Sequence, residues 1–442
     1  FSSRRRHTRL LTVTGVQTCA LPIYPTWTLT LALILLLVAH TLARWLLASR
    51  QIRHIARHAD AVPADFASSI GLPEHRKAAH YSLDKLRLSV ADVALDAVVL
   101  LGWTLLGGLE ALNQVLLLWL GPGMSQEIAL VLAFVLIGGL IHLPLSWLET
   151  FGIEERFGFN RSTPSLWLSD LIKGVMLGLL LGVPILWVVL TLMAAGGTWW
   201  WVWAWLALVA YQLLVMWIAP NVIMPLFNRF TPLEDESLKE RVSALMARSG
   251  FTAKGFFVMD GSRRSAHSNA FFTGFGASKR VVFFDTLLQQ LDVGEMEAVL
   301  AHELGHFKHR HVLKMMVRSF ATTLLGLAVL GWLSQQSWFY AGLGVSPMLT
   351  QGSNHALALV LFMLVLPLPL FFLSPLGSAL SRRQEFEADA YAAQQARASD
   401  LKTALLKLYR DNASTLTPDP WYVAFYYSHP PAGQRLARLA PA

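Results

Sequence analysis

The chain has 442 residues, a length that would suffice for about two or three soluble domains, but its composition excludes a soluble protein. Hydrophobic residues make up 54% of it and charged residues only 14%, whereas soluble proteins carry about 25% charged residues. The net charge of +8 does not indicate a nucleic-acid partner, because the excess Lys and Arg flank apolar segments, as the positive-inside rule expects of a membrane protein.

The first two dozen residues differ in character from the rest of the chain. They begin with the basic run Arg4–Arg6 and contain no apolar stretch of signal-peptide length before Pro22. Residues 1–23 resemble translated sequencing-adapter sequence, so we expect 1–24 to be a non-native leader. The single cysteine, Cys19, lies in it, and one cysteine excludes an intrachain disulfide framework and a thiolate-rich zinc site.

Seven apolar segments after the leader are long enough, at about 20 residues, to cross a bilayer as helices. Some contain prolines, such as Pro184 and Pro367, which membrane helices tolerate where neighbouring helices satisfy the freed carbonyl groups. We predict an all-α polytopic membrane protein whose spans lie near residues 26–48, 93–120, 128–149, 171–195, 199–218, 313–334 and 355–376.

Lys and Arg are distributed unevenly between the linkers. None occurs between Arg87 and Arg156 or between Lys173 and Arg229, so alternate linkers carry no positive charge. Because basic loops stay on the cytoplasmic side, the protein is predicted to be multi-pass with its long polar segments on the cytoplasmic face, in a bacterial inner membrane or a eukaryotic endoplasmic reticulum. The segments expected to face the cytoplasm are 49–92, 150–170, 219–312 and 377–442.

These assignments divide the chain after the leader into four parts. Two of them consist mainly of membrane spans, and two consist mainly of polar segments. The parts are 25–218 with the first five spans and their cytoplasmic loops, 219–312 as a cytoplasmic region, 313–376 with the last two spans, and 377–442 as a C-terminal region.

The longest polar stretch, 219–312, is predicted to form a small α/β region. Residues 234–250 show the apolar spacing of an amphipathic helix, and Gly250 is a suitable end for it. The apolar runs that follow have the length and composition of strands. The expected strands are 256–259, 270–272 and 280–284, with a hairpin turn at Gly274 and Gly276.

Residues 302–306 read His-Glu-Leu-Gly-His, which is the H-E-x-x-H pattern of zinc proteases. The preceding residues 296–301 are good helix formers, and Asp292 can cap the start of that helix. Histidines four positions apart lie on one face of a helix, so both imidazoles can bind one metal ion. Glu303 lies beside them, where it can take a proton from the attacking water.

A catalytic zinc needs a third protein ligand and an open position for water or substrate. After the last predicted span, residues 381–392 are predicted to form a helix with Glu385 and Asp389 on one face. We expect one Zn²⁺ per chain, bound by His302, His306 and Glu385. Asp389 would accept the free ring N–H of a ligating histidine and fix its orientation.

Each pattern also has a simpler interpretation. A pattern with three fixed positions in five residues occurs by chance in unrelated proteins. The nearby His309 and His311 also allow the interpretation that this segment is simply rich in histidine. The helix at 381–392 could be a solvated helix whose charges lie on the surface. The apolar residues Val299 to Ala301 favour a buried site for the first pattern, and each pattern supports the other.

The chain resembles the integral-membrane CAAX prenyl endopeptidase (type I) family of gluzincin zinc proteases over nearly its whole length after the leader. The combination of motifs is far more specific than H-E-x-x-H alone. The resemblance implies seven transmembrane helices that enclose a large water-filled chamber, with the zinc near its cytoplasmic side. Beside the two metal motifs, the matching stretches are 153–161 with Asp170, 268–275, 279–287, and 428–431 with Arg435.

The resemblance also implies residues that contact substrate. His429 and Arg435 would lie near the scissile carbonyl, where developing negative charge favours fixed donors or cations. Each residue also has an ordinary alternative: His429 could lie in a surface loop, and Arg435 could contact a phospholipid. The residues that would pair with an extended substrate backbone are Asn269, Ala270, Phe271 and Phe272.

We therefore expect a zinc-dependent endopeptidase whose partners are the lipid bilayer and a peptide or protein substrate, with C-terminal lipidation of that substrate left open. One alternative keeps the protease chemistry but assigns it to quality control of misfolded membrane proteins. Another, of a different class, is a zinc-binding transporter or receptor without hydrolase activity. Ionisable residues within spans would be its signature, and the candidates are Asp96, Glu110 and His142.

Overall fold

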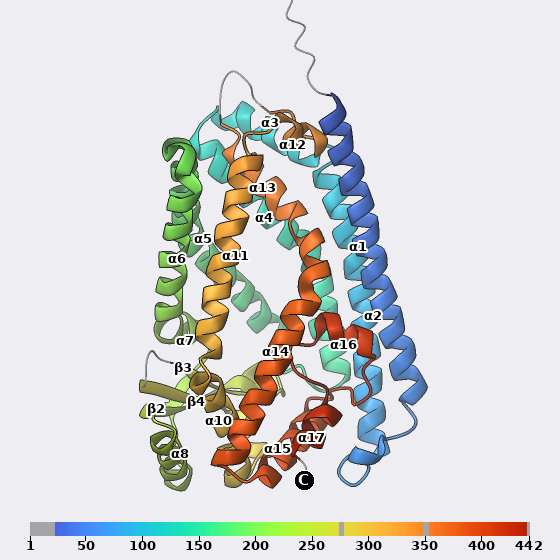
Figure 1. Ribbon diagram of the computed structural model, residues 1–442, viewed down its shortest axis with the longest axis vertical. Helices are drawn as coiled ribbons and strands as arrows, with labels where there is room; N and C mark the ends of the chain where they lie inside the picture. The colour runs from blue at the N-terminus through green and yellow to red at the C-terminus, as the bar shows by residue number, and fades with distance from the viewer. Residues whose placement is uncertain (1–22, 274–277, 348–352, 440–442) are drawn as a thin grey trace, which may run out of the picture.

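The computed structural model describes residues 23–273, 278–347 and 353–439. Most of the predicted leader, with Cys19, lies outside the described residues, as do Gly274 and Gly276 of the predicted hairpin turn. Helices dominate the architecture, and a small sheet lies at one end of it (Figure 1).

Long helices form the membrane-spanning part of the molecule. Among the described residues, five helices are long and apolar enough to cross a membrane, or up to seven if each of two bent pairs counts as one span. This number agrees with the seven predicted spans. The helices are α1 (Ile23–His58), α2 (Leu72–Trp103), α3 (Gly108–Leu120), α4 (Met124–Trp147), α5 (Pro164–Ala195), α6 (Trp200–Ile218), α11 (His311–Leu333), α13 (His355–Val365) and α14 (Pro367–Gln395).

Two predicted spans are bent rather than straight. The segment 93–120 is divided between α2 and α3, which meet at 51°, and Gly107 in the break has φ +79°, a conformation that favours glycine. The segment 355–376 bends by 48° between α13 and α14, where Pro367 removes a backbone donor. The structure also differs in that α14 continues through residue 376, so the last span and the helix with the predicted third ligand are one helix.

The small sheet has four strands within the described residues, in the order β1-β2-β4-β3. The central pair, β2 and β4, is parallel, and β1 and β3 pair antiparallel with their neighbours. All three predicted strands are present, and the predicted amphipathic helix is α8, capped by the Asp235 side chain. The strands are β1 (Phe230–Pro232), β2 (Thr252–Met259), β3 (Ala270–Thr273) and β4 (Ser278–Phe284).

Shorter helices complete the fold around the sheet and the ends of the long helices. The α-helices are α7 (Met224–Phe227), α8 (Glu236–Arg248), α9 (Asp285–Gln290), α10 (Val293–Lys308), α12 (Ser337–Gly342), α15 (Ala398–Asp411), α16 (Pro420–Tyr426) and α17 (Ala432–Leu439). The 3₁₀ and π segments are η1 (Ala64–Phe66), η2 (Leu148–Glu154), η3 (Gly197–Trp199), η4 (Ala219–Ile223) and η5 (Gly261–Arg263).

Apolar side chains form two large buried clusters at opposite ends of the molecule. One packs the sheet against α8, α10, α15 and α17, and the other joins the far ends of the membrane helices. Between them the long helices bury little surface: the most apolar windows of α5 and α6 are only 11% and 6% buried. Helices that bury so few residues are spaced apart or face lipid. This arrangement is consistent with a chamber that the long helices surround and that the two apolar clusters close at its ends.

The segments predicted to share one side of the membrane lie at one end of the molecule (Figure 1). The turn between α1 and α2, the sheet, α10, α15 and α17 all lie at the lower end of that view, opposite α3 and α12. Distant parts of the sequence therefore meet at this end, and the predicted metal motifs are among them.

Candidate active site

The H-E-x-x-H motif lies in α10, a helix whose start is fixed by side chains. Asp292 accepts a hydrogen bond from the backbone N–H of Glu295, and the Glu295 carboxylate accepts one from the N–H of Asp292. This capping box satisfies two N–H groups that have no partner within the helix. The helix carries His302 and His306 four positions apart, and α14 lies against it.

His302, His306 and Glu385 converge although they come from α10 and α14. The His302 Nε2 atom lies 3.2 Å from His306 Nε2 and 3.5 Å from Glu385 Oε2, and His306 Nε2 lies 3.3 Å from Glu385 Oε1. A tetrahedral zinc with bonds of about 2.1 Å requires ligand atoms about 3.4 Å apart. In the described structure the buried Glu385 Oε2 has no hydrogen-bond partner, so the donor set fits zinc.

A buried ion pair orients the first of these imidazoles. The Nδ1–H of His302 donates to Asp389 Oδ1 at 2.8 Å, which directs the Nε2 atom toward His306 and Glu385. Arg435 binds the same carboxylate through two atoms, with Nε 2.8 Å from Oδ2 and Nη2 2.6 Å from Oδ1. Arg435 therefore lies behind His302, on the side away from Glu385.

The second imidazole also has a hydrogen-bond partner, one that is not among the residues predicted from the sequence. His306 Nδ1 donates to His311 Nδ1 at 3.0 Å, and His311 Nε2 donates to Glu387 Oε2 at 3.0 Å. Arg310, at φ +56°, turns the chain between α10 and α11 so that the His311 side chain faces back toward His306. The sequence signal for this partner was the presence of His309 and His311 shortly after the motif, which could also be explained by a segment that is merely rich in histidine.

The protonation of the site follows from these contacts. Burial lowers the pKa of His302, but the neighbouring carboxylates of Asp389, which accepts its ring N–H, and of Glu385 outweigh that effect and raise the pKa to about 9 in the metal-free protein. Burial also lowers the pKa of Arg435, but the hydrogen bonds that it donates to Asp389 outweigh that effect and raise the pKa, so the guanidinium stays charged. Metal binding must therefore displace a proton from His302 near neutral pH.

A cavity of about 140 Å³ brings together most of the other predicted residues. Glu303 lines it beside His302, and Arg435 forms part of its wall. His429 also lines it, with Nε2 3.5 Å from Glu385 Oε1 and a side chain that is 64% exposed. Asn269 and Ala270 reach the same cavity from the sheet.

Strand β3 is an edge strand of the sheet among the described residues, because it pairs only with β4. Asn269 directly precedes it and is exposed, with its Oδ1 accepting the N–H of Ala270 at 2.8 Å. The two phenylalanines do not reach the cavity. Phe272 packs into the core, where its ring meets Phe307, and Phe271 lines a separate pocket with residues of η4 and α7.

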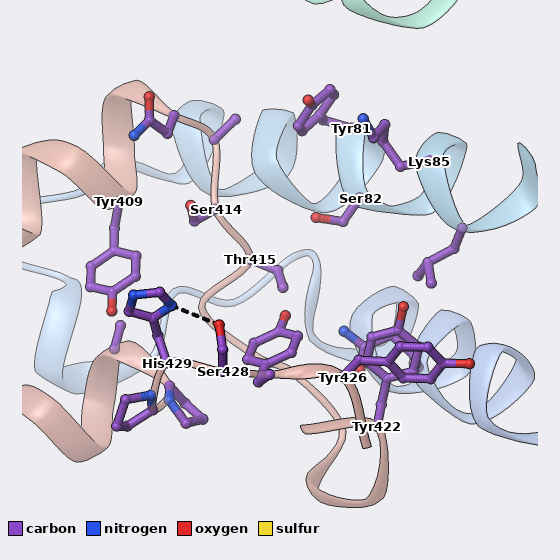
Figure 2. Close-up of a pocket in the computed structure, with 18 of the residues that line it drawn as sticks. Tyr81, Ser82, Lys85, Tyr409, Ser414, Thr415, Tyr422, Tyr426, Ser428 and His429 are labelled. Atoms are coloured by element: carbon purple, nitrogen blue, oxygen red, sulfur yellow. Dashed lines mark hydrogen bonds between the residues drawn. The ribbon is translucent and has the colours of Figure 1, made fainter. Parts of the chain in front are cut away.

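A larger cavity of about 570 Å³ adjoins the first, and its lining is drawn in Figure 2. It lies between α2 and the segments that follow α15 and α16, and Asn412 and His429 line both cavities. In it Ser428 Oγ lies 3.0 Å from His429 Nδ1, so the imidazole is held at the boundary. Five tyrosines line the larger cavity: Tyr81, Tyr409, Tyr422, Tyr426 and Tyr427.

Two family descriptions together match almost the whole chain. Residues 51–229 match "CAAX prenyl protease N-terminal, five membrane helices", and residues 232–441 match "Peptidase family M48". The chain belongs to the M48 family of CAAX prenyl proteases. This assignment agrees with the family resemblance inferred from the motifs, and it makes the protein a membrane zinc endopeptidase.

Relatives from several eukaryotes are similar over most of their length. "CAAX prenyl protease 1" of Saccharomyces cerevisiae is 39% identical over 68% of this chain and 69% of its own. The "CAAX prenyl protease 1 homolog" of Oryza sativa subsp. japonica is 34% identical over 88% and 92%, and that of Homo sapiens 31% over 91% and 94%. The crystal structure of S. mikatae Ste24p superposes with a TM-score of 0.87 at 32% identity, over 93% of this chain and 99% of that one. The shared fold is a membrane chamber with a soluble domain.

Membership in this peptidase family decides against the alternative of a transporter or receptor. The intramembrane charges that suggested it have structural partners. Arg44 Nη1 lies 3.2 Å from Asp96 Oδ2, and His142 Nδ1 lies 3.1 Å from Asp92 Oδ1, so these groups join α1, α2 and α4. Glu110 accepts the N–H of Ser346 at 3.0 Å.

Proposed function

We propose that one zinc ion per chain is bound by His302, His306 and Glu385. The observation that carries this proposal is the set of three ligand-atom separations of 3.2–3.5 Å, with both Nε2 atoms facing the carboxylate. Zinc in such a site supplies a Lewis acid that polarises the scissile carbonyl and lowers the pKa of the attacking water toward about 7.

The protein groups around that site would move and hold the proton. Glu303 follows a ligand directly in the sequence and lines the cavity, so it takes the proton from the attacking water and passes it to the leaving amine. His429, at the boundary of the two cavities, donates to the oxygen on which negative charge develops. Arg435 and Asp389 hold His302 in its tautomer rather than touching the reacting atoms.

The substrate would lie as an extended chain along the open edge of β3. Its backbone would pair with Ala270 and the residues beside it, with Asn269 at the start of the strand. The residues on one side of the scissile bond would then enter the tyrosine-lined cavity past His429. Phe271 and Phe272 would bind the substrate through their backbone groups only, because their side chains lie in a separate pocket and against the core, respectively.

We further propose that substrates with a lipidated C-terminus are among those cleaved. The names of the relatives support this, and so does a catalytic cavity attached to poorly buried membrane helices, where a lipid chain could be accommodated. The catalytic end would face the cytoplasm, because the Lys-rich and Arg-rich linkers all belong to that end. Residues 219–312 and 377–442 would together form the catalytic unit.

The experiment is mass spectrometry of products from a peptide library incubated with the purified protein and with its Glu303→Gln variant, with the zinc content of both measured. We expect cleavage by the wild type alone, with zinc bound to both proteins, since amide and carboxylate are similar in size. Undiminished cleavage by Glu303→Gln would rule out its role. Matched farnesylated and unmodified peptides test the lipid proposal, and equal cleavage of both would favour the broader role in membrane-protein quality control.

A further inference from the structure

Three arginines and one histidine lie on one face of α1 where this helix leaves its apolar segment. Arg50, Arg53, His54 and Arg57 are spaced at i, i+3, i+4 and i+7, which places them in one stripe on a helix. Together with Asp419 they line a cavity of about 240 Å³. The cavity therefore has three permanent positive charges and one carboxylate in its wall.

The carboxylate neutralises only one of these charges. Arg50 binds Asp419 through Nε at 3.3 Å and Nη2 at 2.9 Å, which fixes one arginine at the wall. Arg53 is exposed and donates from Nε to the carbonyl of Ser49 in its own helix, and Arg57 is exposed one turn further on. Within the described residues neither Arg53 nor Arg57 forms an ion pair, so the cavity carries a net positive charge.

The cavity lies at the level of a membrane surface. The apolar part of α1 ends at Ala48, directly before the stripe, and α16 packs beside it with Trp421 62% exposed. Trp45 and Tyr426 are also partly exposed at this level. Exposed Trp and Tyr at the end of apolar spans are typical of the headgroup region, where Arg side chains meet lipid phosphates.

We propose that this cavity binds the phosphate headgroup of an anionic glycerophospholipid. Arg53 and Arg57 supply the charge and the paired donors that phosphate oxygens accept, and Arg50, held by Asp419, closes the wall. The acyl chains would lie along the apolar face of α1 above the stripe, where Leu42 and Leu46 are exposed. A zwitterionic headgroup fits less well, because its ammonium would enter a cavity that already carries excess positive charge.

The test is a titration of the purified full-length protein with phosphatidylglycerol and, separately, with phosphatidylcholine, followed by native mass spectrometry. In the variant Arg53→Gln/Arg57→Gln we expect phosphatidylglycerol binding to weaken by about 10-fold or more, since each arginine near a membrane surface contributes about 5-fold. Phosphatidylcholine binding should be weaker than that of phosphatidylglycerol in the wild type and unchanged in the variant.

The matched control is Arg229→Gln/Arg263→Gln, which removes two exposed arginines from the same end of the molecule. It should bind phosphatidylglycerol like the wild type, as should Arg53→Lys/Arg57→Lys to within a few-fold, since that variant keeps the charge. An equal loss of phosphatidylglycerol binding in this control would show that the lipid is attracted by the overall positive charge of this end of the molecule, and it would overturn the proposal. Wild-type binding by the Arg53→Gln/Arg57→Gln variant would overturn it too, as would displacement of the lipid by inorganic phosphate at equal concentration.

Discussion

Gly305 lies against Ala388 where α10 crosses α14. A Cβ atom at position 305 would be 3.0 Å from the Cα of Ala388 and 3.1 Å from its carbonyl oxygen, closer than most side-chain contacts in proteins. Glycine is therefore needed in the H-E-x-x-H motif of this chain, despite its cost in a helix, to let the two helices approach. Their approach brings Glu385, one turn before Asp389 on α14, to the two imidazoles.

Gly305→Ala should weaken zinc binding without preventing folding. The added methyl group would separate the helices by a few tenths of an ångström and draw Glu385 away from the imidazoles, so we expect the zinc dissociation constant to rise about 10-fold. Competition with a chelator measures it. Gly326→Ala on α11 is the control, because a methyl group there meets nothing within 4 Å. Unchanged affinity in Gly305→Ala would contradict the packing argument.

Arg435→Met should lower zinc affinity as well as activity. Its guanidinium neutralises the buried Asp389, and without it that carboxylate loses two hydrogen bonds and no longer holds His302 firmly. We expect a loss of about 10- to 100-fold in zinc affinity and a lower midpoint of thermal unfolding, since breaking a buried ion pair costs about 3–5 kcal/mol. If Arg435 acted only on the substrate, zinc affinity would not change and kcat alone would fall.

His311→Ala should also reduce zinc affinity, although the residue touches no metal. It accepts the ring N–H of His306, and removing it leaves that imidazole free to rotate. We expect a loss of about 10-fold or more in affinity, measured by chelator competition. His309→Ala is the matched control, because His309 is exposed and stacks on His311 without binding a ligand. Equal effects of the two variants would mean that His311 matters only for packing.

The metal motifs were predictable because helix geometry alone determines them. Positions four apart share a face of a helix, so His302 with His306 and Glu385 with Asp389 followed from spacing. The crossing of α10 and α14 depends on tertiary packing at Gly305, which no local pattern encodes. The directions of the β3 side chains also depend on the fold: neighbouring residues of a strand point to opposite faces, so the Phe271 and Phe272 rings lie in different places, and the predicted backbone pairing with substrate stays a prediction.

The remaining differences have backbone causes. The apolar segment 93–120 has the composition of one span, but the structure divides it between α2 and α3, which meet at 51°, and α3 packs into the apolar cluster at the far ends of the membrane helices. The role of His311 depends on a single left-handed residue, Arg310. Such a conformation is uncommon for arginine and has no sequence signal, so the hydrogen bond between His306 and His311 could not be predicted.

Thr415→Trp should impair cleavage by filling the tyrosine-lined cavity. Thr415 lies in the wall of that cavity, between Ser414 and the tyrosines (Figure 2), and an indole there would occupy space that an extended substrate needs. We expect KM to rise by about 10-fold for long peptides with little change in zinc content, a loss of about 1.4 kcal/mol in substrate binding. Thr415→Ser, which leaves the cavity open, should retain the wild-type KM. Normal cleavage by Thr415→Trp would exclude the cavity from the substrate path.

Zinc uptake by the metal-free protein should release a proton from His302. Its pKa of about 9 in that state means that the imidazole is protonated at pH 7.5, whereas a metal ligand must be neutral. Calorimetric titration with zinc in buffers of different ionisation enthalpy should give about one proton released from this group at pH 7.5, about half a proton at pH 9, and fewer at higher pH. Zinc affinity should rise about 10-fold per pH unit below 9.

The same shift sets how the stability of the metal-free protein depends on pH. The pKa of His302 is higher in the folded state, about 9, than the value of 6.5 for a free histidine, so protonation stabilises the fold. That stabilisation is complete below pH 6.5 and is lost as the pH rises through 9. The unfolding midpoint of the metal-free protein should therefore fall over this window, and the difference between zinc-bound and metal-free protein should widen. In a His302→Gln variant the metal-free protein should lose this part of the pH dependence, and an unchanged profile there would assign it to another group.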